Sequence, residues 1–153
     1  MLYEILKEGL IKTDVVAANR DEAIAEVGKL MVDHGSIEPS YIKAMCEVAS
    51  DLEGYIVITK GVAMPHARPE KGVNKICSAI ILLRNPVEFG NEKNDPVKLV
   101  IALAAIDGSS HMSLLKDIAT VFGEDETVEQ LKAAKNSDEI LRIIKKASEE
   151  ADE

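Results

Sequence analysis

His66 follows a short apolar run and a proline, in the segment GVAMPH of residues 61–66. This run predicts the end of a strand, because Pro65 has no N–H for a sheet ladder and keeps the preceding residue extended. His66 is therefore expected at the rim of a sheet, on stiffened backbone. Rigid placement suits an imidazole that acts as a nucleophile. Imidazole can act in this way because a large fraction of it is in the uncharged form near neutral pH. On this motif alone, His66 could also be a solvent-exposed loop residue that takes no part in a reaction.

A second histidine, His111, follows another apolar run, residues 97–106, at a point where a helix is expected to begin. Ser109 or Ser110 is the expected N-cap residue of this helix, because a serine hydroxyl can accept a free backbone N–H. The N-terminus of a helix carries unpaired N–H groups and a partial positive charge, and both favour an anion. His111, in the first turn, would lie beside such an anion site.

Arg68 adds a cation two residues after His66. Two histidines, an arginine and a helix N-terminus together favour phosphoryl transfer, in which one imidazole takes the group and the other donors hold its oxygens. This interpretation requires the strands before the two histidines to be neighbours. A metal site is the competing interpretation, with Asp107 or Glu70 as the third protein ligand. The usual short spacings of metal-binding histidines are missing, however.

Hydrophobic periodicity predicts the elements that must position these residues. Helical spacing is present at residues 2–8, 20–34, 39–52 and 110–122, in a short segment after residue 125, and at 137–147. Apolar and β-branched runs predict strands near 13–18 and at 55–59, 62–64, 76–83 and 97–106, with a loop at 84–96. The expected fold is α/β, with a central mixed sheet of about five strands flanked by helices in a single layered domain.

The composition excludes several classes of protein. The net charge of −9, from 18 basic and 27 acidic side chains, disfavours nucleic acid and anionic membranes but suits a basic protein partner. Three Tyr, two Phe and no Trp are too few for a base-stacking platform. No apolar run reaches the length of a membrane span, and the first residues lack the features of a signal peptide. We therefore expect a cytoplasmic protein without membrane insertion.

Three further residues receive no chemical role. Cys46 and Cys77 lie far apart in the sequence and without zinc-type spacing, so both are expected to be buried thiols. His34 lies in the last turn of the helix expected at residues 20–34, where it would complement the helix dipole.

The segment GVAMPH resembles the active-site signature of the type-2 enzyme IIA domains of the bacterial phosphoenolpyruvate:sugar phosphotransferase system, the mannitol/fructose class. The segment LVIALAA of residues 99–105, with His111-Met112 and Leu114-Leu115 after it, resembles that family's second block. The resemblance runs to about residue 147. Residues 1–147 are thus expected to form the IIA domain, and residues 148–153 a frayed acidic tail. Residues 64–73 are most similar to the ascorbate branch.

This resemblance implies that His66 accepts a phosphoryl group from the histidine-containing phosphocarrier protein and passes it to a cysteine of a IIB component. His111 would support that group. The resemblance implies no cofactor and no metal for the relay, and only an indirect link to the membrane IIC subunit. Mannitol-type and nitrogen-regulatory members carry an arginine in the preceding helix, but residues 44–50 here contain none. Arg68 is expected to supply that charge, with Ser109 and Ser110 binding the phosphate.

The leading interpretation is thus a phosphoryl-transfer component of an uptake system for ascorbate or a related sugar or sugar alcohol. A regulatory phosphoprotein in nitrogen or carbon signalling would use the same chemistry. A hydrolase that uses both histidines, with or without a metal, is the third interpretation. The start methionine and the acidic end favour a free-standing chain.

Overall fold

The computed structural model describes residues 1–51 and 55–151. In this part of the chain, five strands form one mixed sheet, as the sequence predicts, and the structure arranges them in the order β1-β4-β5-β3-β2. β4 pairs in parallel with β1 and antiparallel with β5, and β3 pairs in parallel with β5 and antiparallel with β2. The strands are β1 (Ile11–Val15), β2 (Val57–Thr59), β3 (Val62–Ala63), β4 (Cys77–Val87) and β5 (Val97–Ala104).

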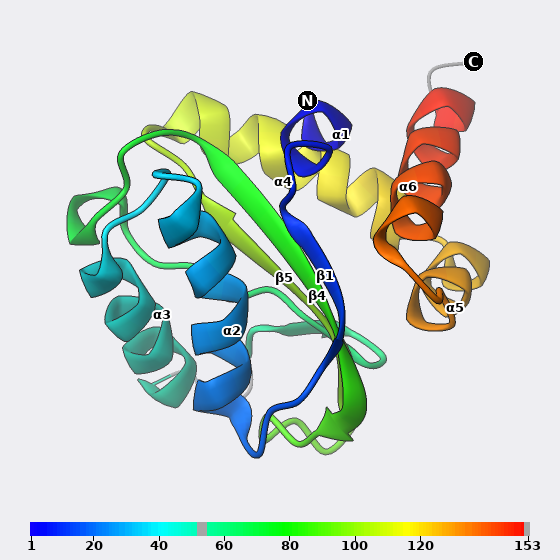
Figure 1. Cartoon of the computed structure of the whole chain (residues 1–153), viewed down its shortest axis with the longest axis horizontal. Helices are drawn as coiled ribbons and strands as arrows, with labels where there is room; N and C mark the ends of the chain where they lie inside the picture. The colour runs from blue at the N-terminus through cyan, green and yellow to red at the C-terminus, as the bar shows by residue number, and fades with distance from the viewer. Residues whose placement is uncertain (52–54, 152–153) are drawn as a thin grey trace.

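Helices cover both faces of the sheet. Figure 1 shows α2 and α3 on one side, and α1, α4, α5 and α6 on the other. The helices are α1 (Leu2–Leu6), α2 (Arg20–Asp33), α3 (Pro39–Asp51), α4 (Gly108–Phe122), α5 (Asp125–Lys132) and α6 (Ser137–Ala151), with a 3₁₀ turn η1 at Pro69–Lys71. The expected α/β layered architecture is therefore confirmed.

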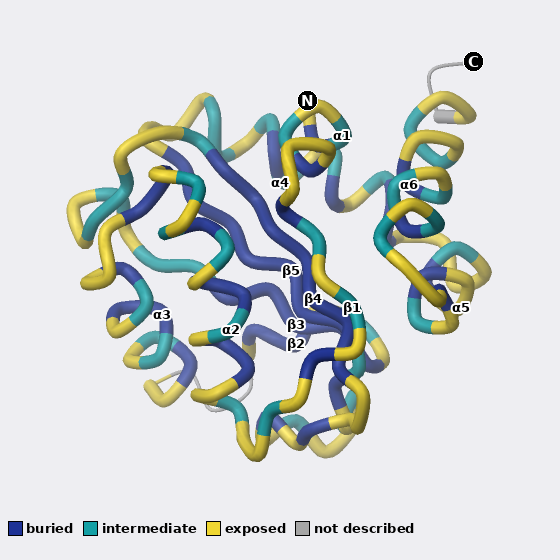
Figure 2. The backbone as a smooth tube through the Cα atoms, in the orientation of Figure 1, coloured by how far each residue is buried: buried dark blue, intermediate teal, exposed yellow. Residues whose placement is uncertain are grey.

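The core lies around β4 and β5, the two central strands. Ala79 to Leu83 and Leu99 to Ala104 are buried along their whole lengths, which Figure 2 shows as dark blue strands between the helical layers. Both faces of these strands are covered, which explains why their sequences are continuous apolar runs rather than alternating ones.

Several predicted boundaries were wrong. β1 begins at Ile11 rather than near residue 13 and ends at Val15, because its register is set by pairing of Ile11 with Ile80. β2 begins only at Val57. β5 ends at Ala104, two residues early. α6 continues to Ala151, so residues 148–151 are helical rather than frayed. The predicted end of α3 at residues 52–54 lies outside the described residues.

β4 is longer than predicted and takes up the first residues of the expected loop at 84–96. Val87 pairs with Val97, although the register shifts between Leu82 and Val87. Arg84 lies on this extension and donates two hydrogen bonds to the carboxylate of Asp14, at 2.8 and 2.9 Å. Pro86 is tolerated because it lies where the ladder is irregular.

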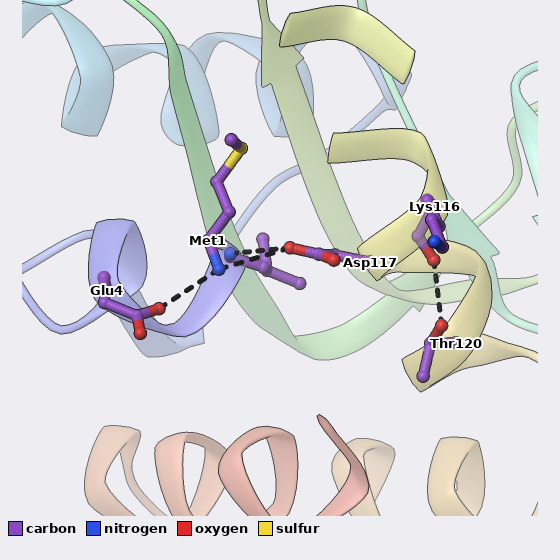
Figure 3. A network of polar contacts seen from close by, with 6 residues as sticks. Met1, Glu4, Lys116, Asp117 and Thr120 are labelled. Carbon is purple, nitrogen blue, oxygen red and sulfur yellow. Dashed lines mark hydrogen bonds and ion pairs between the residues drawn. The ribbon is translucent and has the colours of Figure 1, made fainter. Parts of the chain in front are cut away.

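The N-terminal segment is attached to α4 by polar contacts of Asp117 (Figure 3). The carboxylate of Asp117 lies 3.4 Å from the terminal ammonium of Met1, which also pairs with Glu4 at 3.2 Å. The backbone N–H of Leu2 donates to the same carboxylate at 3.0 Å. α1 is thereby fixed against the helix whose first turn contains His111.

Gly61 occupies a tight turn between β2 and β3, with a positive φ of 77°. Its N–H donates to Asn94, and its carbonyl accepts the N–H groups of Lys98 and Leu99. A Cβ at this position would lie 3.2 Å from the side chain of Lys132. The turn immediately before the His66 strand therefore requires glycine.

We expect Gly61→Ala to lower the free energy of unfolding by about 1–2 kcal/mol, because alanine is strained in the left-handed region. Urea unfolding followed by circular dichroism measures the change. Gly108→Ala is the matched control: a Cβ there has no neighbour within 4 Å, and alanine is favoured over glycine in a helix. Equal urea midpoints for Gly61→Ala and wild type would contradict the requirement for glycine.

Candidate functional site

The sheet register brings the two histidines together. β3 and β5 are parallel neighbours, with Val62 opposite Leu99 and Ala63 opposite Val100. Both strands therefore end at the same edge, where His66 follows β3 and His111 lies in the first turn of the helix after β5. The centroids of the two imidazole rings are 6.2 Å apart, and the rings are tilted by 48°. A phosphoryl group can lie between rings at this separation.

The ring of His66 has a defined tautomer. Its Nδ1 lies 3.0 Å from the carbonyl oxygen of Met64. Since a carbonyl only accepts hydrogen bonds, Nδ1 carries the hydrogen and donates it. In the neutral ring, Nε2 then keeps its lone pair. His66 is half-buried, so its orientation is fixed while the ring stays in reach of another molecule.

A cleft of about 420 Å³ opens in front of the two rings. It is lined by α3, the segment after β3, the end of β5 and the start of α4. The lining residues are Tyr41, Val48, His66, Ala67, Arg68, Pro69, Leu103, Ala105, Asp107, Gly108 and His111.

The N-cap residue of α4 is Asp107, so the expectation of Ser109 or Ser110 was wrong. The Asp107 carboxylate accepts the N–H of Ser110 at 2.8 Å, and the Ser110 hydroxyl in turn accepts the N–H of Asp107 at 3.3 Å. Hydrogen bonding from Ser110 to the carboxylate, chiefly from the backbone N–H, holds the pKa of Asp107 below its usual value. Neither serine is among the residues that line the cleft, and their contact with phosphate stays a prediction.

Arg68 lies at the cleft mouth, at the N-cap of η1, with an exposed side chain. In the part of the chain that the structure describes, no carboxylate forms an ion pair with Arg68, so its guanidinium is available to an anion. Val48 of α3 lines the same cleft, within the segment where mannitol-type members carry arginine. Across residues 1–51 and 55–151, no group of three His, Cys, Asp or Glu side chains lies close enough together to bind a metal ion. Neither Asp107 nor Glu70 therefore forms such a group with the two histidines.

Sequence reasoning missed Tyr41, a buried residue of α3 that reaches the His66 segment. Its hydroxyl accepts the N–H of Ala67 at 2.9 Å and lies 2.8 Å from the carbonyl of Leu103. Burial raises the pKa of Tyr41 to about 12. A tyrosine on the apolar face of an amphipathic helix is typical of a core residue, so the sequence contained no signal for these contacts.

Three residues expected to have no role in the site indeed lie outside the cleft. Cys77 is buried, whereas Cys46 is only half-buried, which corrects its prediction. Burial raises the pKa of both thiols, that of Cys46 to about 11. His34 is the C-cap residue of α2; its Nδ1 lies 2.6 Å from the Ser36 hydroxyl, and its Nε2 lies 3.4 Å from a Glu8 carboxylate oxygen.

The geometry agrees with comparisons with known proteins. Residues 4–147 match the sequence profile of the family described as "Phosphoenolpyruvate-dependent sugar phosphotransferase system, EIIA 2". The chain belongs to this family. EIIA components carry out phosphotransfer, and the chain therefore has a transferase role. In the described residues of this EIIA chain, no helix combines the length and the apolar character needed to cross a bilayer.

Two kinds of relative stand out among similar EIIA proteins. The ascorbate-specific EIIA component of Shigella flexneri is 33% identical over 145 residues, with 94% of each chain covered. The solution structure of the mannitol-specific cryptic enzyme IIA CmtB from Escherichia coli superposes with a TM-score of 0.86 at 33% identity, covering 95% of this chain and 99% of that one.

A third similar structure is a complex. It contains the mannitol enzyme IIA and the phosphorylated mannitol enzyme IIB from Escherichia coli, and its matching chain has a TM-score of 0.79 at 26% identity. The match covers 90% of this chain and 94% of that one.

Proposed function

We propose that this chain relays a phosphoryl group through His66, from the histidine-containing phosphocarrier protein to a cysteine of a IIB component. One observation carries the proposal. His66 donates Nδ1–H to the Met64 carbonyl, which leaves the lone pair on Nε2. The centroid of its ring lies 6.2 Å from the centroid of the His111 ring. An oriented neutral imidazole is a nucleophile that needs no further activation.

The relay consists of two displacements at phosphorus. In the first, the Nε2 lone pair of His66 forms the new N–P bond while the N–P bond of the donor phosphohistidine breaks, and the donor nitrogen keeps that electron pair. In the second, a thiolate of the IIB component attacks the phosphorus, and the bonding pair returns to Nε2. Neither step requires a redox partner. Throughout both steps, Nδ1 keeps its hydrogen and continues to donate it to the Met64 carbonyl.

His111 and the start of α4 would hold the phosphoryl oxygens. Within the described residues, no hydrogen bond engages the ring nitrogens of His111, so both are available to the bound group. His111 and Gly108 line the cleft from the N-terminal turn of α4, where the helix dipole favours negative charge. Preorganised donors at a site of developing charge are the main source of catalysis in phosphoryl transfer.

The transported compound is ascorbate or a related sugar or sugar alcohol in this proposal. The support comes from the ascorbate-specific relative, which covers 94% of the chain. The IIA–IIB complex of the mannitol system supports a IIB partner. This chain would act on the membrane IIC subunit only indirectly, through the IIB component. A cytoplasmic location is part of the same proposal. Nothing in the cleft favours the regulatory or the hydrolytic alternative over this relay.

Reconstitution tests the proposal directly. The chain is mixed with phosphoenolpyruvate, enzyme I and the phosphocarrier protein, and the phosphorylated residue is mapped by mass spectrometry under alkaline conditions. We expect acid-labile phosphate on His66, and its transfer to an ascorbate-type IIB protein on addition of that protein. Absence of phosphate from His66 would refute the relay, and release of free phosphate from a small ester would support a hydrolase instead.

We expect Arg68→Ala to slow phosphoryl transfer by about 10- to 100-fold, because a cation at the cleft mouth is lost. Its stability should change little, since the side chain is exposed. Stopped-flow transfer from the phosphocarrier protein measures the rate, with Arg142→Ala in α6 as the control. An added Val48→Arg should restore part of the rate, because position 48 lines the same cleft. An unchanged rate in Arg68→Ala would reject the role of this arginine.

A further inference from the structure

The hydroxyl of Tyr41 connects three backbone groups at the edge of the site. It accepts the N–H of Ala67 at 2.9 Å, and the carbonyls of Leu103 and Ala67 lie 2.8 and 3.0 Å from it. A phenol has a single hydrogen, which can be donated to only one of these carbonyls at a time. The side chain is completely buried, and its pKa of about 12 keeps the hydroxyl protonated at neutral pH.

The backbone on both sides of His66 is connected to one residue of β5, Leu103. Before His66, the carbonyl of Pro65 accepts the N–H of Leu103 at 3.0 Å. After His66, the N–H of Ala67 is linked through Tyr41 to the carbonyl of Leu103. The last paired residue of β3 is Ala63, opposite Val100. Ala67 lies beyond this pairing, and the Tyr41 hydroxyl takes the place of the strand partner that Ala67 lacks.

The position of the backbone determines what the His66 ring can reach. The Nδ1–H of His66 donates to Met64, only two residues earlier in the same segment. This short-range bond forms only while the local backbone keeps its bend. If the Ala67 end is released, the bond to Met64 weakens, and either ring nitrogen can carry the hydrogen.

We infer that Tyr41 is a positioning residue for His66: its hydroxyl holds the Ala67 backbone so that Nε2 of His66 faces the cleft as an unprotonated nucleophile. The single hydrogen of the hydroxyl is donated to a backbone carbonyl and is not available to a phosphoryl oxygen, so Tyr41 acts through His66 and not on the phosphoryl group. Misplacement of a reacting group by about 1 Å can cost 10²-fold in rate. This inference rests on the proposed relay at His66.

Tyr41→Phe tests the inference, because it keeps the ring in the core and removes only the hydroxyl. We expect single-turnover transfer at saturating phosphocarrier protein to fall by about 10- to 100-fold, with an unchanged half-saturating concentration. ¹⁵N NMR of the histidine rings should show His66 as the Nδ1–H tautomer in wild type and as a mixture in Tyr41→Phe. Tyr3→Phe, in α1, is the matched control and should match wild type in both measurements.

A wild-type transfer rate in Tyr41→Phe would overturn the inference. So would a slower rate with an unchanged tautomer and a raised half-saturating concentration, since that pattern indicates a docking defect. If Tyr41→Phe does not unfold cooperatively, 3-fluorotyrosine at position 41 replaces it: the weaker acceptor should slow transfer, and no slowing would count against the inference. The tautomer is read without any transfer, so failure of the relay and failure of the inference are distinguishable.

Discussion

Replacement of His66 by glutamine is expected to abolish phosphate incorporation, with a loss of more than about 10³-fold in rate. Glutamine retains a polar side chain of similar reach but has no nucleophilic nitrogen lone pair at neutral pH. The donors around the cleft would then have no phosphorylated group to hold. Incorporation of ³²P from phosphoenolpyruvate through enzyme I and the phosphocarrier protein measures the loss.

His34→Gln is the matched control, because His34 contacts Glu8 and Ser36 and lies outside the cleft. Its phosphorylation should be the same as in wild type. In the phosphorylated wild-type protein, ³¹P and ¹⁵N NMR should place the phosphoryl group on Nε2 of His66, since Nδ1 donates to the Met64 carbonyl. Phosphate on Nδ1, or on another residue of His66→Gln, would contradict the assignment of the nucleophile.

The overall fold could be predicted because the strongest local signals agree with the tertiary structure. The helix starts expected at residues 20 and 137 are correct. Each start is capped by an asparagine: Asn19 accepts the N–H of Glu22 at 2.9 Å, and Asn136 accepts that of Glu139 at 2.9 Å. The continuous apolar runs correctly marked the central strands. The end of β4 could not be predicted, because Asn85 and Pro86 favour a loop locally and only the pairing of Val87 with Val97 keeps them in the strand.

The candidate site could be predicted only as far as its chemistry is local in sequence. The motif at His66 and the helix start at His111 indicated a nucleophile and an anion site, but their proximity depends on the pairing of β3 with β5. The N-cap was misassigned because aspartate and serine cap helices about equally well, and the extended backbone at Asp107 decided between them. Tyr41 was missed because its partner Ala67 lies 26 residues away.

Substitution of His111 by alanine should give the second largest loss, about 10²- to 10³-fold in the rate of transfer to His66. His111 is the side chain that faces His66 across the cleft, with a ring-centroid separation of 6.2 Å. Its ring can donate to a phosphoryl oxygen as the N–P bond forms, and alanine removes this donor. The product should still be phosphorylated at His66, because the nucleophile and its bond to Met64 are unaffected. Rapid-quench kinetics with labelled phosphocarrier protein measures the rate.

Comparison with His111→Gln separates electrostatic support from simple filling of the cleft. Glutamine also donates through its amide, so His111→Gln should recover part of the rate that His111→Ala loses. His34→Ala again serves as the control for removal of an imidazole elsewhere. Equal rates in His111→Ala and wild type would contradict the assigned role. The phosphoryl group would then be held only by α4 and Arg68, and the 6.2 Å approach of the two rings would have no part in the transfer.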